Sequence, residues 1–300
     1  MSGRLRYAVH AYAWTSSWSS ADLPVIDHVR ELGLDAVEIP LMEPDEVDPA
    51  AIAERAQTAG VEVVTSLALP EGADPADEDA DVRRRGLELL RHCIDLTADM
   101  GATSFSGVLY SAIGRRIHRR PEEADYARAA ETLKEAARFA QGRGVRIGIE
   151  PINRYETFLV NTAEQARALV DRIDEPNVGI HLDAYHMNIE EDGFYEPTLA
   201  TVPYLVHFHM SESHRGIPGR GTVDWDAIVR ALADGGYSGL VGLESFADIA
   251  EAMKAATCIW RDLAPSSDVL VSEGLAFLKG LERTYYSSER ATIDGDRKGL

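Results

Sequence analysis

The chain has 300 residues, of which 45% are hydrophobic, and it carries a formal net charge of −20 at pH 7. This charge argues against binding to nucleic acid or to an anionic membrane surface, because both are polyanions. No apolar run approaches the roughly 20 residues that span a bilayer, and the N-terminal residues lack the apolar core and cleavage site of a signal peptide, so the sequence predicts a cytoplasmic protein.

Short apolar runs rich in β-branched residues alternate with longer segments of helical periodicity. The eight strand-like runs lie at residues 5–13, 36–42, 61–69, 103–110, 146–152, 178–185, 204–212 and 239–247. The basic run RRIHRRP at 115–121 falls in a loop, which we interpret as solvated. The connection at 186–203 has the weakest helical pattern, and helical segments at 248–263 and 268–287 close the chain. Several helices are followed by a glycine typical of a C-cap: Gly33, Gly60, Gly101, Gly144 and Gly236.

Eight such units predict parallel strands joined by crossover helices. The compact closed arrangement is an α/β fold, the (β/α)8 or TIM barrel of about 250 residues, here with a C-terminal helical extension. We predict a single barrel domain over residues 1–290 and a flexible polar tail at 291–300. The alternative is an open doubly wound sheet, which needs a glycine-rich phosphate loop after an early strand. The stretch HAYAWTSSWS after the first run does not resemble one.

Polar side chains mark the ends of the last four strand-like runs. Glu150 ends the fifth run, Asp183 the sixth and Glu244 the eighth. The seventh run contains both His207 and His209, which alternation places on the same side, so spacing alone does not choose between them. Gaps of 33, 26 and 35 positions, each about one strand–helix unit, separate Glu150, Asp183, His209 and Glu244. Because the C-terminal ends of barrel strands meet at one face, these groups should converge.

Three carboxylates that converge in a pocket of low dielectric repel one another and cannot all stay ionised. A divalent cation removes this conflict. One imidazole with three carboxylates is an oxygen-rich set, which suits Mn²⁺, Co²⁺ or Mg²⁺ better than structural Zn²⁺. Asp183 is therefore a predicted ligand, and His186 projects toward whatever the cation holds. A lone histidine in a strand is usually a satisfied core residue, the interpretation that we give to His181 and His207.

Longer motifs lie along most of the chain: HAYAWTSSW, VEIPLMEP and FSGVLYSA in the first half, then IEPINRYETFLVNT at 149–162, GIHLDAYHMNIEE at 179–191, HFHMSESHRGIPGRGTVDWD at 207–226, VGLESF at 241–246 and IWRDL at 259–263. Together they resemble the ketose 3-epimerases (D-tagatose 3-epimerase and D-allulose, or D-psicose, 3-epimerase) within the xylose-isomerase-like TIM barrels. The resemblance extends to about residue 285. NRYE, LDAYHMNIEE and HRGxxGxG are specific to this group, whereas wider relatives share the metal set.

The resemblance implies a divalent metal, Mn²⁺ or Co²⁺ with Mg²⁺ as an alternative, held by Glu150, Asp183, His209 and Glu244. It thereby selects His209 over His207. It implies hydrogen bonds to the substrate around C1 to C3 from Glu156, His186 and Arg215, and a pocket wall near His10, Trp14, Ser66, Ile113 and Phe246. It also implies a homodimer or homotetramer.

The implied reaction inverts C3 of a free ketose, of the D-allulose/D-fructose, D-tagatose or L-ribulose type, through a cis-enediolate. A proton next to the C2 ketone leaves one face of C3 and returns to the other. This requires a Lewis acid for the developing oxyanion and acid/base groups on opposite faces. Glu150 and Glu244, on the fifth and eighth strands, are the predicted catalytic pair. The net charge and the lack of a phosphate loop favour an unphosphorylated substrate.

The nearest alternative is a related sugar enzyme on the same barrel: an aldose–ketose isomerase, a hydroxypyruvate isomerase or an inosose dehydratase. These would differ in the NRYE and HRG stretches. A metal-dependent abasic-site endonuclease would need more metal-binding histidines and a basic groove, and the negative charge argues against it. The non-enzyme alternative is a module that binds a sugar without turning it over.

Overall fold

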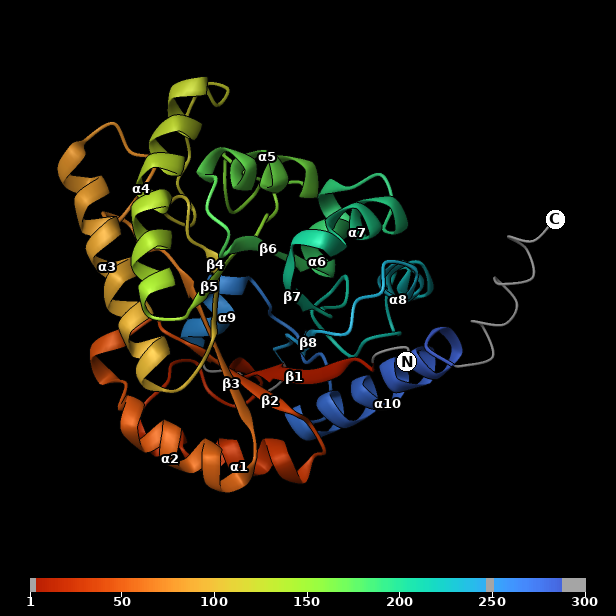
Figure 1. The fold of residues 1–300 in the computed structure, drawn as a ribbon. Helices are drawn as coiled ribbons and strands as arrows, with labels where there is room; N and C mark the ends of the chain where they lie inside the picture. Colours follow the sequence, from red (N-terminus) through yellow and green to blue (C-terminus); the bar gives the residue numbers. More distant parts are fainter. Residues whose placement is uncertain (1–3, 247–250, 288–300) are drawn as a thin grey trace.

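Eight parallel strands close into a barrel in the order β1 to β8 (Figure 1). The computed structural model describes residues 4–246 and 251–287, so the predicted tail at 291–300 lies outside the described residues. The strands are β1 (Arg6–His10), β2 (Ala36–Pro40), β3 (Glu62–Ala68), β4 (Ser104–Val108), β5 (Arg146–Ile149), β6 (Val178–Asp183), β7 (Leu205–His209) and β8 (Leu240–Leu243). Because β8 also pairs with β1, the predicted (β/α)8 barrel is confirmed.

Most helices form a layer around the outside of the barrel, whereas α9 lies over one end of it (Figure 1). The helices are α1 (Pro24–Glu31), α2 (Pro49–Ala59), α3 (Ala80–Asp99), α4 (Glu123–Gly142), α5 (Ala163–Ile173), α6 (Ala184–Glu190), α7 (Tyr195–Thr201), α8 (Trp225–Asp234), α9 (Glu251–Thr257) and α10 (Ser267–Tyr285). The five predicted C-cap glycines have φ between 66° and 79°, the left-handed conformation that glycine adopts without a steric penalty. None of the helices in the described part of the chain is long and apolar enough to cross a membrane.

Two segments differ from the sequence-based expectation in their boundaries. The connection at 186–203 contains two short helices, α6 and α7, rather than one weak helical segment. The helix expected at 248–263 ends at Thr257, and Cys258 then adopts a φ of +56°. Side chains of α9 and of the chain that follows it line the cavity at the barrel mouth, so this segment covers the barrel end.

The inside of the barrel changes from apolar to polar along its axis. The main apolar core lies between the barrel and the helices, and a small separate cluster inside the barrel consists of Ala8, Ala36, Val64 and Leu240. One pleat further along, His10 on β1 pairs in register with Glu38 on β2. The polar side chains therefore face the C-terminal ends of the strands, where TIM barrels carry their sites.

Candidate active site

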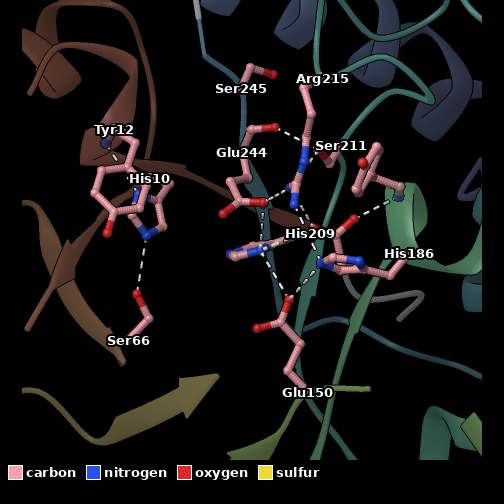
Figure 2. A network of polar contacts seen from close by, with 12 residues as sticks. His10, Tyr12, Ser66, Glu150, His186, His209, Ser211, Arg215, Glu244 and Ser245 are labelled. Carbon is pink, nitrogen blue, oxygen red and sulfur yellow. Dashed lines mark hydrogen bonds and ion pairs between the residues drawn. The ribbon is translucent and has the colours of Figure 1, made fainter. Parts of the chain in front are cut away.

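The predicted ligands meet at the C-terminal mouth of the barrel (Figure 2). Glu150 and Glu244 directly follow β5 and β8, and Asp183 and His209 are the last residues of β6 and β7. We call Glu150, Asp183 and Glu244 the mouth carboxylates. The Nδ1 atom of His209 lies 3.6 Å from Asp183 Oδ2 and 3.6 Å from Glu244 Oε2. It lies 3.9 Å from Glu150 Oε1, so the convergence expected from the strand spacing is present.

Hydrogen bonds orient Asp183 and His209 toward each other. Asp183 is the N-cap of α6, and its Oδ1 accepts a hydrogen bond of 2.6 Å from the backbone N–H of Tyr185. Its Oδ2 is left to face His209. His209 donates from Nε2 to Oε2 of Glu38 at 2.8 Å, which turns its Nδ1 toward the mouth. His207 donates to the same Glu38 oxygen at 2.9 Å, so the two histidines that alternation could not separate are used differently.

The donor set fits a divalent cation. The Nδ1 atom of His209 is buried and has no hydrogen-bond partner. Ligand atoms of Glu150, Asp183 and His209 all lie within 4.8 Å of one another. An unpaired imidazole nitrogen beside carboxylate oxygens matches Mn²⁺, Co²⁺ or Mg²⁺ chemistry. His181, His207 and His209 form a second group of this kind, but the Nε2 atoms of His207 and His209 are already bonded to Glu38.

The field in the mouth favours bound positive charge. Burial raises the pKa of Glu150 well above its usual range; His209 opposes this shift and Glu244 adds to it. Burial also disfavours ionised Asp183, but Arg215 and His209 together outweigh burial and lower the pKa of that carboxyl. Burial disfavours a charged His209, yet Glu38 and Glu244 raise the pKa of its ring well above the usual value. The carboxylates thus attract a proton to the position that faces them, and they attract a cation for the same reason.

Arg215 contacts two of the mouth carboxylates from the loop after β7 (Figure 2). Its Nη1 is paired with Glu244 Oε2 and lies 3.1 Å from Asp183 Oδ2. Its guanidinium carbon lies 4.1 Å from the centre of the Tyr185 ring, at cation–π distance. The backbone of Arg215 has a φ of +63°, a conformation that costs a non-glycine residue energy and is common at functional sites.

A buried carboxylate organises the loop that carries Arg215. Glu212 is fully buried, and its backbone oxygen accepts the N–H of Arg215 at 2.7 Å. Its side chain accepts four further hydrogen bonds of 2.8 to 3.2 Å, from the N–H groups of Ser213, Gly219 and Val223 and from the indole of Trp225. The loop therefore wraps around one ionised group, which holds Arg215 in its strained conformation.

Asn153 joins two of the predicted substrate contacts. Its Nδ2 donates to Glu156 Oε1 at 2.7 Å and to His186 Nδ1 at 2.9 Å. Because Nδ1 of His186 accepts, the ring proton lies on Nε2, which is 4.0 Å from Glu150 Oε1. Burial, reinforced by Arg215, lowers the pKa of His186 to about 3. His186 is therefore a neutral hydrogen-bond donor that faces the mouth.

A cavity of about 930 Å³ opens over these residues. Four of the five predicted wall residues line it: His10, Ser66, Ile113 and Phe246. His10 is fixed by the N–H of Tyr12, which donates to its Nδ1 at 3.1 Å, and its Nε2 lies 3.1 Å from Ser66 Oγ. Trp14 is not among the described residues that line the cavity, because its indole turns away and donates to Asp268 on α10 at 2.9 Å.

Sequence reasoning missed Glu38, Asn153 and Glu212. The signal for Glu38 was an acidic residue inside the apolar run AVEIPLM, one strand away from His10. The interpretation of His181 as a satisfied core residue is wrong, because both of its ring nitrogens lack a hydrogen-bond partner. Its ring packs edge-on against that of His209, with centroids 4.0 Å apart. Burial and the neighbouring imidazoles lower the pKa of His181 well below the usual value, so it is neutral.

The fold and the site resemble those of known proteins. The model of the family described as "Xylose isomerase-like TIM barrel" matches residues 26–279. A ketose 3-epimerase of Arthrobacter globiformis is 36% identical over 92% of this chain and 96% of its own length. An L-ribulose 3-epimerase of Methylomonas sp. is 34% identical over 92% of this chain and 97% of its own.

Solved structures agree with these matches. A D-allulose 3-epimerase from Methylomonas sp. in complex with D-allulose superimposes with a TM-score of 0.88, at 33% identity, over 93% of this chain and 97% of that one. An L-ribulose 3-epimerase structure gives a TM-score of 0.90 at 31% identity, over 96% of this chain and 97% of that one. The chain therefore belongs to the xylose isomerase-like TIM barrel family and, within it, to the ketose 3-epimerases.

Proposed function

We propose that this enzyme inverts C3 of an unphosphorylated ketose such as D-allulose, D-fructose, D-tagatose or L-ribulose. Relatives at more than 30% identity are named for this chemistry. The observation that carries the proposal is the arrangement of two glutamates around one imidazole. Glu150 and Glu244 approach His209 Nδ1 from opposite sides (Figure 2), at 3.9 and 3.6 Å. A substrate carbon between them could lose a proton to one and regain it from the other.

Glu150, Asp183, His209 and Glu244 would hold a divalent cation, for which Mn²⁺ or Co²⁺ is the best fit and which supplies Lewis-acid stabilisation of negative charge on the ketose. Each glutamate has two oxygens, so one can serve as a ligand while the other accepts or returns the C3 proton.

Three residues orient the substrate in this proposal. Neutral His186 donates from Nε2 to a substrate oxygen, and Glu156, held by Asn153, accepts from a substrate hydroxyl. Arg215 supplies positive charge beside the developing oxyanion. The side chains of His10, Ser66, Ile113 and Phe246 line the cavity in which the substrate would bind. A cytoplasmic location and a dimeric or tetrameric assembly stay predictions from the sequence.

The test is to incubate the purified protein with Mn²⁺ and each free ketose, then separate the products by chromatography. We expect the C3 epimer of at least one ketose. An aldose product would instead favour the aldose–ketose isomerase alternative, because that reaction moves a proton between C1 and C2. Faster turnover of a ketose phosphate, measured as kcat/KM, would contradict an unphosphorylated substrate.

A further inference from the structure

Glu38 is a buried carboxylate that the proposed chemistry does not use. It lies on β2 and is 0% exposed. A buried charge is costly unless it is paired and hydrogen-bonded. Its Oε2 lies 2.8 Å from Nε2 of His209 and 2.9 Å from Nε2 of His207. Because an ionised carboxylate only accepts hydrogen bonds, both rings carry a proton on Nε2.

The proton on Nε2 determines what His209 presents to the mouth. Without an acceptor at Nε2, the ring would hold its proton on Nδ1, because Asp183 and Glu244 lie 3.6 Å from that atom. A proton there would occupy the lone pair that a cation needs. Glu38 provides an acceptor on the other side of the ring, so one proton stays on Nε2 and a cation needs to displace only the proton at Nδ1. Metal-bound histidines commonly have such a carboxylate partner, which fixes both the tautomer and the ring plane.

The surroundings of Glu38 hold it in this position. His207 anchors the oxygen that His209 also uses. Gly242 on β8 leaves room for the His207 ring, since a Cβ there would lie 2.8 Å from His207 Nε2. The other oxygen of Glu38 lies 3.7 Å from Nε2 of His10, in the wall of the cavity. Residues of the neighbouring strands β7 and β8 and of the pocket wall therefore surround the carboxylate of Glu38.

We propose that Glu38 is a positioning residue, which holds the proton of His209 on Nε2 and so strengthens binding of the divalent cation at Nδ1. This inference rests on the proposed metal site. Loss of such a partner typically weakens metal binding about 10- to 100-fold. The effect acts through His209, so it should be separable from any effect of Glu38 on folding.

The experiment compares three variants. Their affinity for Mn²⁺ is measured by electron paramagnetic resonance, which reports the concentration of unbound Mn²⁺. Glu38→Leu removes the acceptor, and Glu38→Gln keeps one acceptor oxygen but not the charge. Glu282→Gln is the matched control, because Glu282 is also a buried carboxylate and accepts from Leu5 N–H and the Tyr7 hydroxyl at 2.9 and 3.1 Å. We expect Glu38→Leu to lose about 10- to 100-fold in affinity, Glu38→Gln to lose less, and the control to bind as the wild type does.

A second readout does not depend on the metal. In metal-free protein labelled with ¹⁵N-histidine, the Nε2 proton of His209 should give a slowly exchanging downfield signal that persists in Glu38→Gln and disappears in Glu38→Leu. If Glu38→Leu folds, keeps that signal and binds Mn²⁺ as tightly as the wild type, Glu38 has no positioning role. Failure of the wild type itself to bind Mn²⁺ would overturn the metal site, while the proton signal would still decide the role of Glu38.

Discussion

Asp125 at the start of α4 and Glu150 at the end of β5 are both buried carboxylates, 1% and 8% exposed, but their surroundings are opposite. Arg119 binds Asp125 with two hydrogen bonds of 2.6 and 2.9 Å, and Arg128 adds a third of 2.5 Å. The basic atoms nearest Glu150 are imidazole nitrogens at 3.8 to 4.0 Å.

The pKa shifts reflect this difference. The hydrogen bond from Arg119 lowers the pKa of Asp125 to about 2, whereas burial raises the pKa of Glu150 well above its usual range. The negative charge of Asp125 is balanced by arginines of the same chain, and this pairing stabilises the fold. The mouth carboxylates are under-compensated, since Arg215 is shared between two of them. Uncompensated buried charge is what a site retains for a ligand that the chain itself does not supply.

The largest effect should come from removing the cation. Chelation should abolish epimerisation and lower the melting temperature, because the mouth carboxylates then repel one another; Mn²⁺ or Co²⁺ should restore both. Saturating metal at about 100 times its Kd would add roughly 2.7 kcal/mol of stability. Activity assays and thermal melts, with and without chelator, measure this. Full activity in protein shown by elemental analysis to be metal-free would contradict the site.

Replacing either of the two proposed catalytic glutamates should come next in size. Glu150→Gln or Glu244→Gln keeps the shape and one ligand oxygen but removes the proton carrier, so activity should fall by about 10²- to 10⁴-fold or more. Each variant retains a carboxylate on one face only. The two should therefore favour opposite epimers when exchange of the C3 proton with solvent deuterium is followed by NMR. If both variants lose exchange with both epimers while the metal stays bound, Glu150 and Glu244 do not act on opposite faces of C3.

Glu212→Gln should have a smaller effect on catalysis. One or more of the four hydrogen bonds to the side chain of Glu212 would be lost, at about 1 kcal/mol or more each, and the loop would hold Arg215 less firmly. We expect kcat/KM to fall about tenfold, mainly through a lower kcat, because Arg215 is proposed to stabilise charge that develops in the transition state. Steady-state kinetics measure this, and unchanged KM and kcat would show that the loop does not need this carboxylate.

Asp125→Asn should lower stability without affecting catalysis. Loss of charge-assisted hydrogen bonds to a buried group costs about 1.5–3 kcal/mol, and urea unfolding would measure it. Asp81→Asn is the matched control, because Asp81 is paired with Arg84 at 3.2 Å but is 72% exposed; such a pair contributes about 0–1 kcal/mol. A reduced kcat of Asp125→Asn, at a temperature where the variant is folded, would contradict the conclusion that Asp125 stabilises the fold whereas the mouth carboxylates serve catalysis.

The smallest effect concerns pH. The pKa of Asp125 is about 2 in the folded protein and about 3.9 in an unfolded chain. Its contribution to stability is therefore complete above about pH 4 and is lost as the pH falls toward 2. Between these values the stability difference between the wild type and Asp125→Asn should shrink. A stability difference that stays constant across this pH range would show that ionisation of Asp125 does not cause it.

Much of this molecule could be predicted from local pattern. The alternation of strand and helix gave the barrel, because a strand of period two and a helix of period 3.6 leave distinct hydrophobic patterns. The spacing of Glu150, Asp183 and Glu244 along the chain gave their convergence, because all barrel strands end at one face. The choice of His209 over His207 came from the resemblance alone.

Other features needed the tertiary structure. The basic run at 115–121 was interpreted as a solvated loop, yet Arg119 binds buried Asp125, and Arg115 binds buried Asp74 at 2.8 Å. Trp14 faces α10 rather than the cavity. Glu38 meets His209 across 171 positions of sequence. Hydrophobic periodicity reports which face of an element is buried, but not which polar groups of distant elements meet there, because that depends on register and on how the barrel closes.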